Sequence, residues 1–386
     1  FVGYAGLVIP FAYAIAALWK RDYVGWADVA WPWTLFSWLF LGAGIAIGAF
    51  WAYETLGWGG YWGWDPVENS SLVPWLTATA LAHGLITQKS RGTLVRWNLF
   101  LAPITFALVL YATFLTRSGI LSESSVHSFT DTGLGPFLVG VLVAAVAVTL
   151  WLLAKRFKDI PDQTIYEKYV SRDFAMLLAV LVVLVLATVV LVGTSTPIVP
   201  KAGLRPDFYN ATSSPLALVL AIILSFCPLL AWRESDLGKL ARGLAVPALV
   251  AGAALVIALA LGVTHPVSLS VVGFVVFAAA LNVAMIVRIY KAGIWKLGGY
   301  VAHVGVGLIL VGIVGSAAYS QTEQLRLNQG QTGQALGYTF TFNGLRTEAG
   351  SDKAVLKLTA MRGSESFVAE PVMIASRDGM VRNPYI

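Results

Sequence analysis

The four histidines of this chain, His83, His127, His265 and His303, are the side chains best suited to chemistry. Two of them, His83 and His303, lie inside long apolar stretches, where an ionisable group is costly and is a functional candidate by default. Counted along helices that rise 1.5 Å per residue, their depths agree to within about 5 Å. Two neutral imidazoles with no cysteine or carboxylate nearby suit haem iron. For either histidine alone, a simple bond to a neighbouring helix's carbonyl remains the alternative.

Glycines lie four positions to either side of His303, at Gly299 and Gly307. This spacing puts them on the same helix face and predicts a flat surface for a planar macrocycle. His127 lies in a polar loop that follows Arg117, where it could ligate a second haem. Arg117 could pair with a haem propionate or act as an interfacial anchor. His265, in a short turn, is expected to be structural.

Tryptophan is concentrated in one region, with nine of the 14 lying between Trp26 and Trp75. Any single ring there could be an anchor at the membrane interface. The densest part is different, because aromatic rings alternate with glycines that allow close backbone approach. We expect it to form a surface that stacks on a large flat partner. Its rings are Trp58, Tyr61, Trp62 and Trp64.

Two carboxylates, Asp65 and Glu68, follow these rings directly. They could accept hydrogen bonds from a bound partner. Asp65 followed by Pro66 also has the pattern of a helix start, with Asp65 as the N-cap and Pro66 in the first turn. The two roles can coexist.

These residues lie in a chain of 386 residues that is 58% hydrophobic and 12% charged. That composition excludes an ordinary cytosolic globular protein. The lone Cys227 excludes an intrachain disulfide and a thiolate metal cluster. About ten apolar stretches are long enough to cross a membrane as helices. We expect spans near residues 1–19, 33–53, 72–88, 97–115, 133–154, 174–193, 215–232, 244–263, 269–287 and 298–319.

The positive charges predict an orientation. With alternating loops, sixteen of the 26 Lys and Arg residues fall on one side, three on the other and seven in the tail beyond Gln321. The basic side should be cytoplasmic. The net charge of +6 therefore requires no nucleic acid and mostly anchors loops at the inner leaflet.

The predicted fold class is an all-α polytopic membrane protein with a small extracytoplasmic β domain at its C-terminal end. Residues 1–320 form the transmembrane helical domain, with the aromatic loop at 55–75 facing outward. Residues 321–386 are polar, with glycine-containing turns and alternating runs at 338–342 and 356–358, which predict β structure.

The order of these motifs resembles the CcmF/NrfE family of cytochrome c haem lyase subunits. The likeness rests on the run from Trp58 to Ser71, His83, the segment 114–119 followed by His127, and the segment 299–307 around His303. The aromatic run is similar to the tryptophan-rich "WWD" signature of haem-handling proteins. Its Asp-Pro-Val-Glu-Asn-Ser continuation favours this family over the haem-delivery subunit CcmC and the CcsA synthases.

The resemblance implies that His83 and His303 bind a permanent haem b within the membrane. It implies that His127 holds a transient substrate haem delivered by the periplasmic chaperone CcmE. The family's other outward histidine belongs to a His-Pro-Pro run that should precede Phe1. We therefore expect residues to be missing before Phe1, and the chain to continue after Ile386.

The implied reaction joins haem vinyl groups to the thiols of a Cys-x-x-Cys-His motif in apocytochrome c, forming thioether bonds. The catalytic set would be Trp58, Tyr61, Trp62, Trp64, Asp65, Glu68 and His127, with haem b as electron donor. Implied partners are CcmE, apocytochrome c and CcmH/CcmI-type thiol-handling subunits, with a quinol as reductant. The implied location is the bacterial cytoplasmic (inner) membrane, with the functional face and the β domain in the periplasm.

Three other functions are compatible with parts of the sequence. A haem delivery or export subunit would also use aromatic rings and histidines, but the sequence has no G-x-x-x-x-G-K-[ST] nucleotide-binding loop. A non-catalytic assembly scaffold would carry no haem. A secondary transporter is disfavoured because the sequence lacks paired broken helices and internal symmetry.

Overall fold

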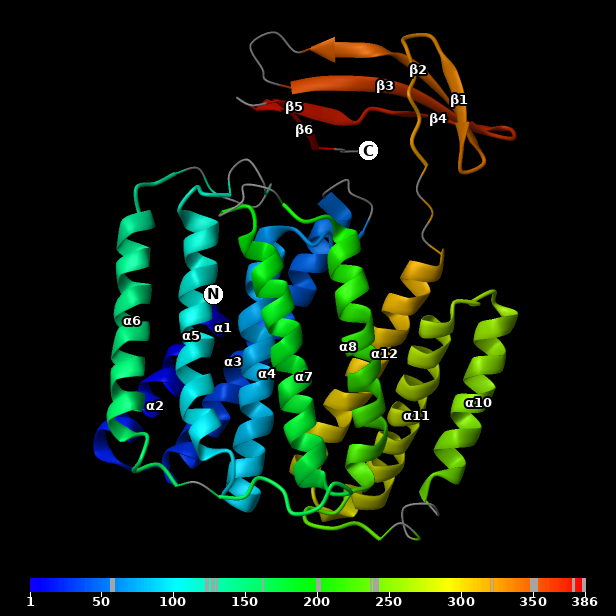
Figure 1. Ribbon diagram of the computed structural model, residues 1–386. Helices are drawn as coiled ribbons and strands as arrows, with labels where there is room; N and C mark the ends of the chain where they lie inside the picture. Colours follow the sequence, from blue (N-terminus) through cyan, green and yellow to red (C-terminus); the bar gives the residue numbers. More distant parts are fainter. Residues whose placement is uncertain are drawn as a thin grey trace. The chain divides into compact units, whose positions relative to one another are not determined.

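The computed structural model shows a mostly helical chain with a small antiparallel sheet at its C-terminal end (Figure 1). It describes residues 1–55, 60–121, 125, 129, 131–161, 163–198, 203–236, 238, 243–319, 321, 323–347, 353–376 and 379–383. The chain divides into two compact units. The first contains Phe1–Gly44 and Trp64–Ala318, and the second contains Ile45–Gly63 and Tyr319–Ile386.

Every predicted span overlaps a helix, although the span expected at 215–232 lies in a helix that begins at Pro206 and ends at Phe226, and the span at 1–19 consists of two helices. The helices are α1 (Val2–Gly6), α2 (Val8–Lys20), α3 (Trp26–Thr55), α4 (Pro66–Arg91), α5 (Val95–Arg117), α6 (Gly135–Arg156), α7 (Arg172–Ser195), α8 (Pro206–Phe226), α10 (Ala245–Ala260), α11 (Pro266–Ile289) and α12 (Gly298–Tyr319). Short 3-10 turns follow at Cys227–Leu229, Tyr290–Ala292 and Ile294–Lys296.

In the part of the chain that the structure describes, eight helices are long and apolar enough to cross a membrane, and α10 is a shorter apolar helix of 16 residues. The chain is therefore a multi-pass membrane protein. Helix α4 has 26 residues but is not among the eight, because it carries polar side chains along much of its length. It can remain in the bundle because it packs against α5 and α7, which shield these groups.

Polar contacts hold α4 against its neighbours. The Gln88 amide donates to the Tyr23 carbonyl at 3.1 Å, and the Asn98 amide of α5 donates to Gln88 Oε1 at 2.8 Å. Gly84 permits this approach, since a Cβ there would collide with Asn98 Oδ1. Hydrogen-bonded pairs of this kind offset the cost of burying amides. These contacts hold α4 in place, and with it the residues that α4 carries.

The second unit contains the sheet. Its strands are β1 (Thr332–Ala335), β2 (Tyr338–Thr347), β3 (Lys353–Arg362), β4 (Glu365–Ala369), β5 (Val372–Ser376) and β6 (Gly379–Asn383). The strand order is β1-β2-β3-β5-β6, and β4 pairs with β3 off this path. All pairings are antiparallel.

The turn between β1 and β2 shows how the sequence builds this sheet. Leu336 and Gly337 both have positive φ, 51° and 78°, between the paired residues Ala335 and Tyr338. Two such residues make the tight turn whose twist matches that of antiparallel strands. The predicted β runs at 338–342 and 356–358 fall within β2 and β3, so the predicted β structure is confirmed.

Candidate functional site

The two intramembrane histidines face each other. His83 lies on α4 and His303 on α12, and their ring centroids are 6.0 Å apart with planes inclined at 39°. The predicted agreement in depth is therefore confirmed. Among the described residues, no group of three or more His, Cys, Asp or Glu could hold a metal ion by itself. A metal held by this pair would take its remaining ligands from other donors, such as water or a prosthetic group.

The tautomer of His83 follows from one hydrogen bond. Its Nδ1 lies 2.8 Å from the carbonyl oxygen of Thr79, one turn earlier on α4. Because a carbonyl oxygen only accepts, Nδ1 must carry the proton, and the lone pair of the neutral ring is left on Nε2. A bond from the second ring nitrogen to a carbonyl is the usual way in which proteins orient a metal-binding histidine.

The separation of the rings fits a metal between them. Two imidazoles bound to opposite sides of one ion, with metal–nitrogen bonds of about 2 Å, place their centroids roughly 6 Å apart. The observed 6.0 Å matches this requirement. The donor set, two imidazole nitrogens with no third His, Cys, Asp or Glu beside them in the described residues, fits a haem iron.

The two glycines that flank His303, Gly299 and Gly307, have different surroundings. A Cβ at Gly299 would meet nothing within 4 Å, so this side of the helix face is open. A Cβ at Gly307 would lie 3.4 Å from Ala279 and 3.5 Å from Val275 of α11. Gly307 therefore provides close packing between α12 and α11, and the open flat surface lies on the Gly299 side of His303.

Two tryptophans, Trp38 on α3 and Trp75 on α4, lie near His83 and were not assigned a role from the sequence. The rings of Trp38 on α3 and Trp75 on α4 are stacked, with centroids 5.5 Å apart and planes inclined at 17°. The Trp38 indole donates to Thr79 Oγ1 at 2.7 Å, and the Trp75 indole donates to the Trp38 carbonyl at 3.2 Å. The signal was present in the sequence, because Trp75, Thr79 and His83 recur every four residues on one helix face.

Of the predicted stacking rings, Trp64 belongs to the first unit and packs onto α8. Its ring stacks on Tyr209 at 4.8 Å with an angle of 8°, and its indole donates to Asn210 Oδ1 at 2.9 Å. The Asn69 amide donates to the Trp64 carbonyl at 3.1 Å. Trp64 has a φ of 55°, which is strained for a bulky side chain. Several contacts thus hold it in an unfavourable backbone conformation.

The sequence did not identify Tyr209 or Asn210. Tyr209 is 2% exposed, and a Cβ at Gly193 of α7 would lie 2.7 Å from its ring, so a glycine is needed there. Tyr61 and Trp62 belong to the second unit, and Trp58 lies outside the described residues. A common stacking surface formed by the four rings remains a prediction.

The predicted helix start at Asp65 is confirmed. Asp65 Oδ2 accepts the backbone N–H groups of Val67 at 2.9 Å and Glu68 at 3.4 Å, while Glu68 Oε2 accepts that of Asp65 at 3.3 Å. Pro66 occupies the first turn, and the arrangement is a capping box. Ser125 Oγ also donates to Asp65 Oδ2 at 2.8 Å. Asp65 thus ties the start of α4 to the loop that precedes His127.

Arg117 ends α5, and its guanidinium lies over the Phe129 ring, 3.9 Å from the centroid. Its carbonyl accepts the Thr132 hydroxyl at 3.2 Å. His127 lies outside the described residues, so its predicted ligand role is not tested. His265 is the exposed residue that precedes α11, and its side chain makes no capping bond.

Comparisons with known proteins agree with these features. Residues 1–121 match the family model described as "Cytochrome C assembly protein". The "Cytochrome c-type biogenesis protein CycK" of Rhizobium meliloti (strain 1021) is 36% identical over 374 residues, which cover 91% of this chain and 55% of the relative. The "Cytochrome c-type biogenesis protein CcmF" of Escherichia coli (strain K12) is also 36% identical, and the match covers 91% of this chain and 56% of the relative.

A more distant relative is the "Probable cytochrome c-type biogenesis protein NrfE" of Escherichia coli (strain K12), which is 30% identical. The solved structure of "Cytochrome c Heme Lyase CcmF" superposes with a TM-score of 0.72 at 30% identity, covering all of this chain and 62% of that one. The chain thus spans a little more than half the length of the curated relatives it matches.

Proposed function

This chain belongs to the CcmF/NrfE family of cytochrome c-type biogenesis proteins, and on that premise we propose that it acts as a cytochrome c haem lyase. The reaction takes haem from the chaperone CcmE and joins its vinyl groups to the two thiols of a Cys-x-x-Cys-His motif in apocytochrome c. Each thiol adds across a vinyl double bond, so that a carbon–sulfur bond forms and the thiol proton goes to the other vinyl carbon. The observation that carries the proposal is the His83–His303 pair at 6.0 Å.

The intramembrane pair is the proposed haem b site. Bound there, haem b would supply reversible one-electron chemistry to the protein. His83 offers Nε2 from α4, because the Thr79 carbonyl holds the Nδ1 proton. His303 offers its ring from α12, beside the open surface at Gly299. His83 lies on a polar helix that packs against α5 and α7, and His303 lies on an apolar helix that is long enough to cross a membrane.

The aromatic loop is the proposed site of the substrate haem. Trp58, Tyr61, Trp62 and Trp64 stack on the porphyrin and hold its vinyl groups near the attacking thiols. For Trp64, the stacking on Tyr209 and the bond to Asn210 provide a rigid base for this task. Rigid support of this kind keeps a reacting group close to its productive geometry.

Polar groups at the same end of α4 complete the substrate site. His127 ligates the substrate iron until the histidine of the apocytochrome motif displaces it, and Arg117 pairs with a propionate. Asp65 and Glu68 fix the start of α4, and Asp65 also holds Ser125, two residues before His127. The Asp65–Ser125 bond supports a position for Ser125 beside the start of α4.

The proposed setting is the bacterial inner membrane, with the aromatic loop and the sheet on the periplasmic side. The distribution of Lys and Arg supports this orientation. The proposed partners are CcmE, apocytochrome c and CcmH/CcmI-type subunits, with a quinol as the proposed reductant. The activity is expected in a complex with these proteins.

The test is an absorption spectrum of the detergent-purified protein, oxidised and then reduced. We expect a six-coordinate haem spectrum that is lost in both His83→Ala and His303→Ala. His265→Ala is the matched control, because this histidine precedes α11 and is exposed, and it should keep the spectrum. Well-folded wild-type protein without haem, or an unchanged spectrum in the two variants, would refute the ligand assignment.

The product of the reaction distinguishes a haem lyase from a haem delivery subunit. Reconstituted protein, supplied with haem-loaded CcmE and reduced apocytochrome c, should form the thioether-linked cytochrome, which keeps its haem under acid extraction. Transfer of haem that stays extractable would favour a delivery function over the lyase.

A further inference from the structure

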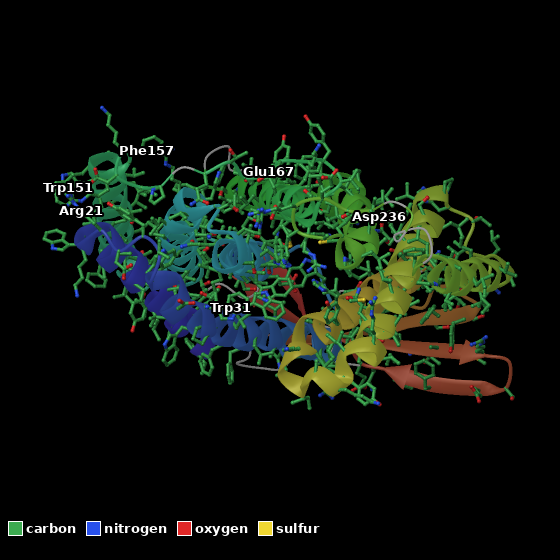
Figure 2. The ribbon with its side chains drawn as sticks, turned by 90° about the horizontal axis from the view of Figure 1, so that it is seen from below. Arg21, Trp31, Trp151, Phe157, Glu167 and Asp236 are labelled. Atoms are coloured by element: carbon green, nitrogen blue, oxygen red, sulfur yellow. The ribbon has the colours of Figure 1, made fainter. Side chains whose placement is uncertain are left out.

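Trp38 on α3 and Trp75 on α4 have no role in the proposed function, although both are bonded to the residue that orients His83. That residue is Thr79, whose carbonyl oxygen lies 2.8 Å from His83 Nδ1. All four residues belong to the first unit of the chain. Trp31, which is labelled in Figure 2, lies on α3 about two turns before Trp38. The contacts around Thr79 therefore bear on how His83 is held.

The Thr79 hydroxyl makes two hydrogen bonds. It donates to the Trp75 carbonyl at 2.8 Å, one turn earlier on α4. Its oxygen accepts the Trp38 indole N–H at 2.7 Å. The direction of the second bond is fixed, because an indole nitrogen only donates. Trp38 thus holds the Thr79 side chain from outside α4.

The two tryptophans tie α3 and α4 together in both directions. The Trp38 indole donates to a side chain of α4, and the Trp75 indole donates to the Trp38 carbonyl of α3 at 3.2 Å. Gly42 gives Trp75 the space that it needs, because a Cβ at Gly42 would lie 2.6 Å from the Trp75 indole nitrogen. Most of the α3 span is not buried inside the protein, so these bonds contribute strongly to its position beside α4.

The bond from His83 to Thr79 has a chemical effect on the ligand atom. A carbonyl that accepts the Nδ1 proton makes the imidazole more basic at Nε2. A more basic ligand favours ferric over ferrous iron, because added negative charge on the ring stabilises the higher charge of the metal. The strength of the bond depends on its length and angle, and so on where the Thr79 carbonyl is held.

Thr87 offers a comparison within the same helix. Its hydroxyl donates to the His83 carbonyl at 3.0 Å, one turn after His83. This bond reaches the backbone of His83 and not its ring. Thr79 and Thr87 thus lie four residues to either side of the ligand, and of the two it is Thr79 that contacts the imidazole.

We propose that Trp38 is a positioning residue for the His83 ligand, an inference that rests on the proposed haem b site. Trp38 holds Thr79, Thr79 keeps its carbonyl on the Nδ1 proton, and His83 presents Nε2 in one orientation. Trp75 supports Trp38 by stacking on it and by its bond to the α3 backbone. Trp38 thereby sets the basicity and the orientation of one axial ligand, and with them the reduction potential of the bound haem.

The test is a redox titration of the detergent-purified protein with its haem b. Trp38→Phe removes the indole donor and keeps an aromatic ring, and Thr79→Val removes the hydroxyl and keeps a side chain of similar shape. Each should weaken ferric haem binding about tenfold, the lower end of the effect seen for the outer partners of a metal ligand. With ferrous binding unchanged, that factor raises the reduction potential by about 59 mV. The electron paramagnetic resonance spectrum of the oxidised protein should change in parallel, because the orientation of the imidazole changes.

Three further variants show whether the effect passes through Thr79. Thr79→Ser keeps the hydroxyl and should keep the wild-type potential. Thr87→Val is the matched control, because it removes a hydroxyl that bonds only the His83 backbone, and it should leave the potential unchanged. The double variant of Trp38→Phe and Thr79→Val should shift the potential no more than either single change, since both break one bond.

A wild-type potential in Trp38→Phe, or an equal shift in Thr87→Val, would overturn the proposal. Equal weakening of ferric and ferrous haem binding, with no shift in potential, would show that Trp38 only stabilises the fold and would overturn it too. Far-ultraviolet circular dichroism shows which variants are folded, and Trp38→Phe alone decides the matter if Thr79→Val is not. Folded wild-type protein without haem would refute the proposed haem b site, and this inference with it, whereas the other outcomes leave that site intact.

Discussion

Helix α4 carries two parts of the candidate site, one at its start and one eight residues before its end, and the side chains of the two parts are held in different ways. At its start, Asp65 accepts two backbone N–H groups and the Ser125 hydroxyl, and Trp64 is held by Tyr209 and Asn210. Near its other end, His83 has one bond, to Thr79, and faces His303 across 6.0 Å. The side chains at the start of α4 are fixed by many polar contacts, whereas the His83 ring keeps a ligand atom available on a part of the helix that Gln88 and Asn98 hold in place.

The two arrangements suit the two proposed tasks, which are to position a substrate and to bind a resident metal. A surface that positions a large substrate works best when it does not move, and the contacts at Trp64 supply that rigidity even against a strained φ of 55°. A ligand for a resident metal needs a fixed tautomer and a lone pair without a competing donor. The single bond from His83 Nδ1 to the Thr79 carbonyl meets both needs.

The largest expected effect comes from removing one imidazole and then restoring it. If haem b is bound as proposed, His303→Gly should lose it, because the iron would lose one of its two proposed protein ligands. Added imidazole should fill the space and return the six-coordinate spectrum. The measurement is haem content per protein with and without imidazole. Full haem content in His303→Gly without imidazole would show that α12 does not supply a ligand, and the comparison between the two ends would fail.

Much of this site was open to prediction because its signals are local. The capping box needs only residues 65–68, and hydropathy alone located the helices. The pairing of His83 with His303 is a long-range contact, but counting depth along two helices predicted it, since helical rise is constant. Both helices cross the same membrane thickness, so depths counted along them can be compared directly.

Other parts depend on how helices rotate and pack, which a single sequence does not fix. Nothing in the sequence pairs Trp64 with Tyr209, or Trp38 with Thr79, because those contacts join separate helices. Gly307 was predicted to flatten the surface beside His303, but it faces α11. A helix in lipid can present any face to its neighbours, so the spacing of glycines predicts a flat face without saying what covers it.

A smaller effect is expected at the start of α4. Asp65→Ala removes the cap and the bond to Ser125, so the free energy of unfolding should fall by about 1–2 kcal/mol. Asp65→Asn keeps a side-chain acceptor and should lose less. The measurement is thermal unfolding of the purified protein, with the haem spectrum recorded in parallel. The spectrum should stay unchanged in both variants, and loss of haem b in Asp65→Ala would show that the two ends are coupled.

The smallest effect is expected at the Trp64 contact, and a double-mutant cycle isolates it. Trp64→Phe removes the indole donor, and Asn210→Ala removes the acceptor, so both break the same 2.9 Å bond. If that bond holds the strained Trp64, the double variant should be less destabilised than the sum of the single variants by about 1 kcal/mol. Asn210→Asp keeps the acceptor and serves as the control. Additive losses would mean that the stacking on Tyr209, which is present at 4.8 Å in the native protein, holds Trp64 without help from Asn210.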